Sequence, residues 1–133
     1  MTISREPYYF IASPYNGTDE EKQYRYKISK KVAADLLKKG ISVLAPILYN
    51  EALGIDPSIR REVLMPMNLA LLQNSKGMIL LKLPGFDSSS GIAGYINTCE
   101  ELHIPIFEVE FNGMEYNLDK LIGEIHTYSH SYL

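Results

Sequence analysis

The sequence lacks the features that mark several large classes of protein. Its 133 residues include one cysteine and no tryptophan, so no disulfide can form within the chain and a reducing, cytoplasmic setting is expected. Lys82 and Pro84 interrupt the longest apolar run, which is shorter than the ~20 residues of a membrane-spanning helix. The first residues are polar and no signal-peptide core follows them.

The chain also lacks an excess of positive charge. Its formal net charge of −3 argues against a dedicated nucleic-acid-binding protein. Neither a Walker A motif nor a G-x-G-x-x-G fingerprint is present. Because 46% of the residues are apolar, intrinsic disorder is excluded. We therefore expect one globular domain, residues 1–133, whose partner is a small molecule rather than a nucleic acid or a membrane.

Segments with strand character alternate with segments of helical period. Strands are expected at residues 8–12, 41–45, 77–83 and 103–109, and helices at about 19–39, 66–74, 89–102 and from 118 onward. Thr18 and Glu21 have the spacing of a capping box at the start of the first helix. This alternation predicts an α/β fold, a single Rossmann-like or flavodoxin-like domain with a parallel sheet of about four to five strands flanked by helices.

One long stretch shows no clear period. Residues 47–61 contain Gly54 and Pro57, so we expect a loop that includes at most one helical turn. Pro66 then suits the first position of a helix, which Leu69 and Leu72 continue.

Ligands of such sheets bind beyond the carboxyl ends of the strands. Three predicted loops meet there, at residues 13–17, 46–50 and 84–91, and they carry the aromatic residues Tyr15, Tyr49 and Phe86. Residues 88–91, Ser-Ser-Ser-Gly, fall where a helix begins. They are equally compatible with a cradle for an anion or phosphate and with simple capping of the helix by serine.

Other chemistry-bearing residues favour structural interpretations. His126 and His130 are four residues apart, but no third ligand with fitting spacing accompanies them, so we expect neither a metal nor a cofactor. Cys99 shares a helical face with Ile92 and Ile96 and is expected to be a small core residue. The lysines of the first helix alternate with acidic residues and indicate a solvated face.

Four short motifs give the chain a family resemblance. They are Ile-Ala-Ser-Pro-Tyr at 11–15, Leu-Pro-Gly-Phe at 83–86, Ser-Ser-Gly at 89–91 and His-Ile-Pro-Ile at 103–106. In this order and spacing they resemble the nucleoside 2-deoxyribosyltransferase-like proteins, especially small bacterial and phage members, and the related nucleoside-monophosphate N-glycosidases. The resemblance covers residues 8–109.

The resemblance implies where a nucleotide and its catalytic groups would lie. Ser89 and Gly91 match the site of the 5′ oxygen or phosphate, and residues 13–15 match the first loop of the family pocket. The family cleaves an N-glycosidic bond with a glutamate four residues after the motif glycine, assisted by an upstream aspartate. Here these two positions hold Tyr95 and Asn68, so both expected carboxylates are absent.

The leading hypothesis is a non-catalytic pocket that holds a nucleotide-derived ligand, as a phage protein that sequesters a host nucleotide signal would. Its expected ligand-binding residues are Ser13, Pro14, Tyr15, Asn16, Asn68, Phe86, Ser89, Ser90, Gly91 and Tyr95. One alternative is an N-glycosidase or deoxyribosyltransferase in which Tyr95 is the nucleophile. A second alternative is a structural or interaction protein with an empty pocket.

The resemblance also implies a homo-oligomer in which a neighbouring chain completes each pocket. The C-terminal tail, residues 126–133, is aromatic and polar. We therefore weigh a contact segment, with Tyr128 and Tyr132 near a neighbour's pocket, equally against a frayed terminus.

Overall fold

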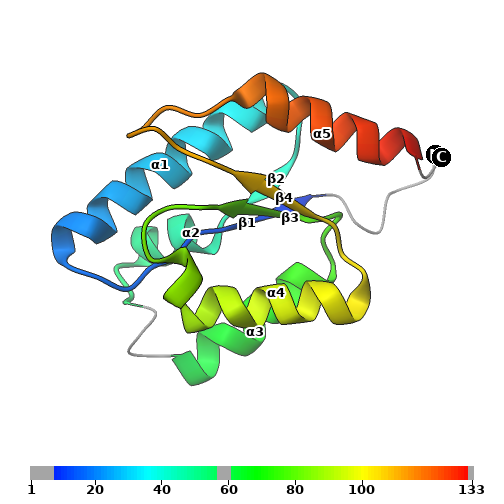
Figure 1. Cartoon of the computed structure of the whole chain (residues 1–133). Helices are drawn as coiled ribbons and strands as arrows, with labels where there is room; N and C mark the ends of the chain where they lie inside the picture. Colours follow the sequence, from blue (N-terminus) through cyan, green and yellow to red (C-terminus); the bar gives the residue numbers. More distant parts are fainter. Residues whose placement is uncertain (1–7, 57–60, 132–133) are drawn as a thin grey trace.

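A four-stranded parallel sheet forms the centre of the molecule (Figure 1). The structure is a computed structural model that describes residues 8–56 and 61–131. The strands lie in the order β2-β1-β3-β4, with β1 at Tyr9–Ala12, β2 at Val43–Leu44, β3 at Met78–Leu81 and β4 at Ile106–Val109. The predicted α/β single-domain fold with a parallel sheet is thus confirmed.

Helices cover both faces of this sheet. They are α1 at Asp19–Lys38, α2 at Pro46–Leu53, α3 at Arg61–Gln73, α4 at Ser90–Leu102 and α5 at Leu118–Ser131, with a short 3₁₀ helix, η1, at Phe86–Ser88. α1 and α5 pack on one face, and α3 and α4 pack on the other (Figure 1). Within the described ranges no helix combines the length and apolarity needed to cross a bilayer.

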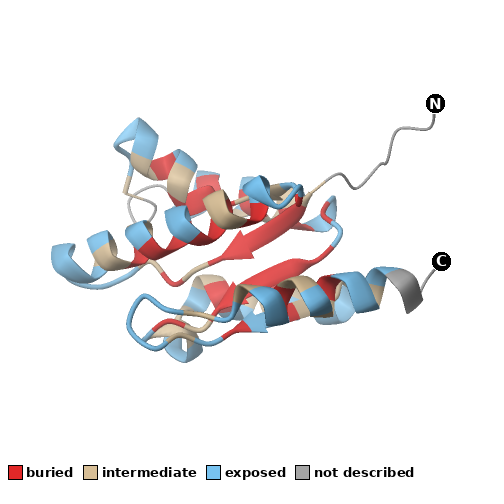
Figure 2. Cartoon of the chain, turned by 90° about the horizontal axis from the view of Figure 1, so that it is seen from above, coloured by how far each residue is buried: buried red, intermediate tan, exposed pale blue. Residues whose placement is uncertain are grey.

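The two central strands are buried along their whole length (Figure 2). Alternate side chains point to opposite faces of a strand. Ile11 and Ile79, which are register partners, join the cluster under α1 and α5, whereas Phe10 and Met78 join the cluster under α3 and α4. Strands with two covered faces are therefore apolar throughout, as the sequence of β3 already indicated.

α1 begins as the capping box predicted. The Glu21 N–H donates to Thr18 Oγ1 (3.1 Å), and Glu21 Oε1 accepts from the Thr18 N–H (3.0 Å). Ile28, Val32 and Leu36 then form a fully buried stripe. This long, well-capped helix is the main cover of the first face.

The expectation of a loop after β2 was wrong, because residues 46–53 form α2. Pro46 occupies the first helical position, where the missing N–H would have no intrahelical partner. Gly54 ends the helix in the left-handed conformation (φ 70°). The proline and glycine that looked like loop residues are therefore the two boundaries of a helix. Residues 57–60 lie outside the described residues.

The predicted start of α3 at Pro66 was also wrong. The helix is already formed at Arg61, and Pro66 lies inside it on the exposed side. Proline removes one helical N–H donor at this point. Leu64, Asn68 and Leu72 follow a period of four and are all buried, and α3 packs mainly against α4. Buried residues thus hold the helix on both sides of the proline.

The described part of the C-terminal tail continues α5. Tyr128 packs edge-on against Phe107 of the sheet, with ring centroids 5.8 Å apart, and the Ser129 hydroxyl lies 3.5 Å from that of Tyr9. Tyr9 begins β1, so this end of α5 lies at the edge of the sheet opposite to the carboxyl ends of the strands. Tyr132 lies outside the described residues, and a tail that reaches a neighbour's pocket stays a prediction.

Candidate functional site

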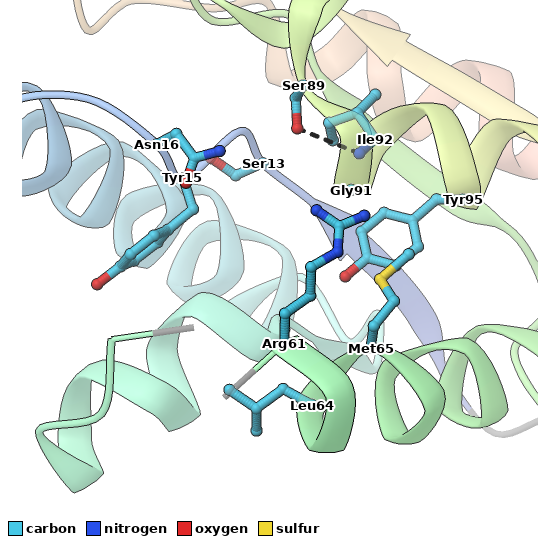
Figure 3. Close-up of a pocket in the computed structure, with 10 residues that line it drawn as sticks. All are labelled: Ser13, Tyr15, Asn16, Arg61, Leu64, Met65, Ser89, Gly91, Ile92 and Tyr95. Atoms are coloured by element: carbon cyan, nitrogen blue, oxygen red, sulfur yellow. Dashed lines mark hydrogen bonds between the residues drawn. The ribbon is translucent and has the colours of Figure 1, made fainter. Parts of the chain in front are cut away.

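A cavity of about 250 Å³ opens beyond the carboxyl end of β1 (Figure 3). The β1–α1 loop forms one wall, α4 forms the facing wall, and α3 lies below them. Its lining residues are Ser13, Tyr15, Asn16, Arg61, Leu64, Met65, Ser89, Gly91, Ile92 and Tyr95. The cavity lies where ligands of open α/β sheets bind.

Six of the residues expected from the sequence line this cavity. They are Ser13, Tyr15, Asn16, Ser89, Gly91 and Tyr95. The structure thus brings together the loop after β1 and the helix after β3, as expected from two neighbouring parallel strands.

The other four expected residues lie beside the cavity or behind its walls. Pro14 is buried in the β1–α1 loop, and Phe86 packs against the apolar cluster of the second face. Ser90 accepts a hydrogen bond from Arg61, and Asn68 is buried next to Tyr95. The loop expected at residues 46–50 instead belongs to α2 and does not line the cavity.

Three lining residues from α3 were missed by the sequence analysis, namely Arg61, Leu64 and Met65. They were missed because α3 was expected to begin at Pro66. The period of four that joins Leu64 to Asn68 and Leu72 was the available signal. Arg61 matters most, because its guanidinium supplies the positive charge among the lining residues (Figure 3).

Tyr95 and Asn68 form a buried polar pair at the inner end of the cavity. Asn68 Nδ2 donates to the Tyr95 hydroxyl (3.1 Å), and the two residues are 6% and 9% exposed. Asn68 Oδ1 has no hydrogen-bond partner within the described part of the chain. Since the phenol oxygen already accepts from Asn68, its own proton is available for an acceptor on a ligand.

Burial raises the pKa of Tyr95 above its ordinary value of 10.0, although the hydrogen bond from Asn68 and the charge of Arg61 act in the opposite direction. The phenol is therefore neutral near pH 7 and a weak nucleophile. No aspartate, glutamate or histidine is among the described residues that line the cavity. The described lining consequently carries one permanent cation and no anion.

The N-terminus of α4 borders the same cavity. Ser89 caps the helix, because its Oγ accepts from the Ile92 N–H at 3.2 Å. The capping interpretation is thus observed, whereas the anion cradle stays a prediction. The two are compatible, since a helix N-terminus has four N–H groups without intrahelical partners and one cap satisfies only some of them.

Cys99 is not among the residues that line the cavity. Cys99 is buried in the cluster under α3 and α4, as predicted for a small core residue. Burial, with a smaller effect of Glu100, raises its pKa to about 11, so the thiol is protonated at neutral pH. Within the described ranges no three His, Cys, Asp or Glu side chains gather as metal ligands would.

Comparison with known proteins adds a family but no activity. The family model described as a domain of unknown function, DUF1937, matches residues 7–111. This range contains every strand and every residue that lines the cavity. No curated protein matches the chain.

Proposed function

We propose that this chain, which belongs to the DUF1937 family of domains of unknown function, binds a nucleotide or nucleotide-derived ligand without cleaving it. The observation that carries the proposal is the composition of the cavity. Among the residues that the structure describes, it combines one guanidinium and a helix N-terminus with two phenol rings and no carboxylate. Such a site attracts an anionic ligand with an aromatic part.

The phosphate of the ligand is placed between Arg61 and the start of α4. Helix N-termini bind phosphate through free N–H groups and the positive end of the helix dipole. A guanidinium adds charge-assisted hydrogen bonds to phosphate oxygens. Ser89 and Gly91 line this part of the cavity, and their match to the 5′-phosphate motif of the deoxyribosyltransferase-like proteins supports the same placement.

The size of the cavity favours a ligand no larger than one nucleotide. Small-molecule pockets typically occupy about 300–1,000 Å³, and this one has about 250 Å³. We therefore propose that the sugar and phosphate are enclosed and that the base extends to the mouth, where Tyr15 lies. Stacking of a base on an aromatic ring contributes about 1–3 kcal/mol.

The absence of cleavage follows from the residues at the inner end of the cavity. The family resemblance predicts a glutamate and an aspartate where Tyr95 and Asn68 stand. A neutral phenol and an amide cannot supply the carboxylate nucleophile and the acidic partner of that reaction. We propose that the ligand is held and later released unchanged, which is the behaviour of a sequestering protein.

The test is to incubate the protein with nucleosides, deoxynucleotides, cyclic nucleotides and ADP-ribose derivatives, and to follow each by chromatography before and after heat denaturation of the protein. A ligand that disappears and returns intact supports the proposal. A ligand that returns as free base and sugar phosphate, with the activity lost in Tyr95→Phe, would show glycosidase activity instead.

A variant of Arg61 and a matched control test whether the guanidinium in the cavity binds the nucleotide. Arg61→Met should weaken nucleotide binding by roughly tenfold to a hundredfold, because a hydrogen bond to a charged group contributes about 1.5–3 kcal/mol. Lys27→Met is the matched control, since it removes one positive charge from the exposed face of α1. A wild-type protein that no ligand stabilises would point to a structural role, because a ligand at 100 times its Kd adds about 2.7 kcal/mol of stability.

A further inference from the structure

Arg25 is a buried cation of α1 that does not line the cavity. It is 4% exposed, whereas the lysines of the same helix were expected to form a solvated face. Its Nη1 donates to the carbonyl of Asn16, and its Nη2 donates to the carbonyl of Pro84 at 2.8 Å. One planar group therefore joins two backbone segments that are far apart in the sequence.

These two segments are the loops that build the walls of the cavity. Asn16 belongs to the β1–α1 loop and itself lines the cavity. Pro84 follows β3, and the short helix η1 connects it to Ser89 on the facing wall. The N–H groups of Phe86 and Ser88 donate to the carbonyls of Leu83 and Gly85, so this connection is internally bonded and a shift of Pro84 is transmitted toward Ser89.

Each of the two loops has a glycine next to the Arg25 guanidinium. Gly17 and Gly85 both have positive φ angles, 150° and 95°. A Cβ atom at Gly17 would lie 3.0 Å from Arg25 Nη1, and one at Gly85 would lie 3.1 Å from Arg25 Nη2. Each loop therefore approaches the guanidinium more closely than a side chain at these positions would allow.

We propose that Arg25 is a positioning residue that fixes the separation of the two cavity walls, a role that rests on the proposed binding function of the cavity. Only arginine suits it, because two carbonyls on different loops require a planar group with several fixed N–H donors. Glu21, one helical turn earlier, lies 3.8 Å from Nη2 and offsets part of the buried charge. The positioning group thus comes from α1, the helix that packs on the opposite face of the sheet from α3 and α4.

The first test compares Arg25→Lys with Val32→Ala, which removes buried methyl groups from the same helix without touching either loop. Hydrogen exchange is followed at the amides of Phe86 and Ser88, relative to the Met78 amide of the central sheet. Arg25→Lys should raise the relative exchange of the two loop amides roughly tenfold, and Val32→Ala should leave it unchanged. Equal acceleration at all three amides in Arg25→Lys would overturn the proposal.

The second test measures binding of deoxyadenosine 5′-monophosphate by the same variants. Arg25→Lys should weaken binding roughly tenfold or more, as expected for losing a charge-assisted hydrogen bond at the wall, while Val32→Ala binds as the wild type does. If the two variants bind equally well, Arg25 acts only on stability and the proposal fails. Selective loop exchange in Arg25→Lys, with no binding of any tested ligand by the wild type, would uphold the loop-fixing role and overturn the binding function.

A glycine pair keeps the proposal testable if Arg25→Lys does not fold. Gly85→Ala pushes a methyl group toward the guanidinium, whereas Gly40→Ala introduces the same left-handed strain (φ 82°) with no heavy atom within 4 Å. Gly85→Ala should lower affinity for the same nucleotide, and Gly40→Ala should not. Equal affinities in the two variants would contradict the proposal.

Discussion

The two faces of the sheet differ in how much apolar material covers them. Among the residues that the structure describes, sixteen buried residues form the cluster under α1 and α5, and eight form the cluster under α3 and α4. The larger cluster is entirely apolar apart from the Tyr9 hydroxyl, while the smaller one includes Tyr95 and Cys99. The candidate site opens into the smaller cluster, since Ile92 and Tyr95 belong to both. We infer that the first face supplies most of the stability, whereas the second face and the β1–α1 loop carry the binding groups.

The largest expected effect is on the first face. Leu36 is fully buried in α1, so Leu36→Ala should lower the free energy of unfolding by about 2–5 kcal/mol. Urea denaturation measures this loss. The affinity of the folded protein for a nucleotide should not change, because Leu36 does not touch the cavity. A large loss of affinity would show that the two faces are not separable.

Tyr95→Phe tests the second face. The variant leaves the buried Asn68 amide without its acceptor, which should lower the free energy of unfolding by about 1–3 kcal/mol. The double variant Asn68→Leu/Tyr95→Phe replaces both polar partners and should recover much of that loss. Nucleotide affinity should stay reduced in both variants, since each lacks the phenol donor. Full recovery of affinity in the double variant would exclude a contact between Tyr95 and the ligand.

Two substitutions of Ser89 distinguish its role in capping α4 from a role in binding phosphate. Ser89→Ala removes the observed cap of α4 and should lower the free energy of unfolding by about 1 kcal/mol, whereas Ser89→Gly should lower it by only a few tenths. If the hydroxyl also contacts phosphate, both variants lose affinity to a similar extent. Unchanged affinity in both would leave capping as the role of the hydroxyl and exclude its contact with the phosphate.

The smallest expected effect is at alkaline pH. Because burial raises the pKa of Tyr95, the folded protein keeps the phenol proton at pH values where the unfolded chain has lost it. The folded state then binds more protons, so stability falls as the pH rises above about 10. Unfolding free energies measured between about pH 8 and 11 should fall less steeply in Tyr95→Phe. The pKa of Tyr116 is also raised by burial, so part of the decline should persist. An unchanged slope would contradict the burial of this phenol.

The sequence predicted the layers of the fold better than the local geometry of the site. Alternating strand and helix periods identified the strands, α1, α4 and α5, because each has a strong apolar pattern or a cap. α2 and the start of α3 were missed, since Pro46 and Gly54 were interpreted as loop residues and Pro66 was interpreted as the first residue of a helix. α2 packs mainly against α1 and α3 mainly against α4, and a short window of sequence does not contain these tertiary contacts.

The same limit applies to the site residues. Ser13 and Tyr15 could be placed because they follow β1, where topology brings a loop to the carboxyl end of the sheet, whereas Tyr95, in the middle of α4, was placed by the family resemblance. Arg61 was missed because the sequence analysis did not predict the beginning of α3, where Arg61 lies. The role of Arg25 depends on two carbonyls and two glycines in loops remote from it, which no spacing along α1 reveals.

The edge of the sheet at β4 has a consequence for self-association. Among the described strands, β4 pairs only with β3, and such an edge can template the addition of a strand from another molecule. Here Lys82 Nζ lies 3.4 Å from Glu108 Oε2 and 3.6 Å from Glu110 Oε1. Charged side chains of both signs therefore lie near this edge strand. Charges of this kind oppose edge-to-edge aggregation. An assembly of several copies is therefore not expected to join by adding a strand to β4.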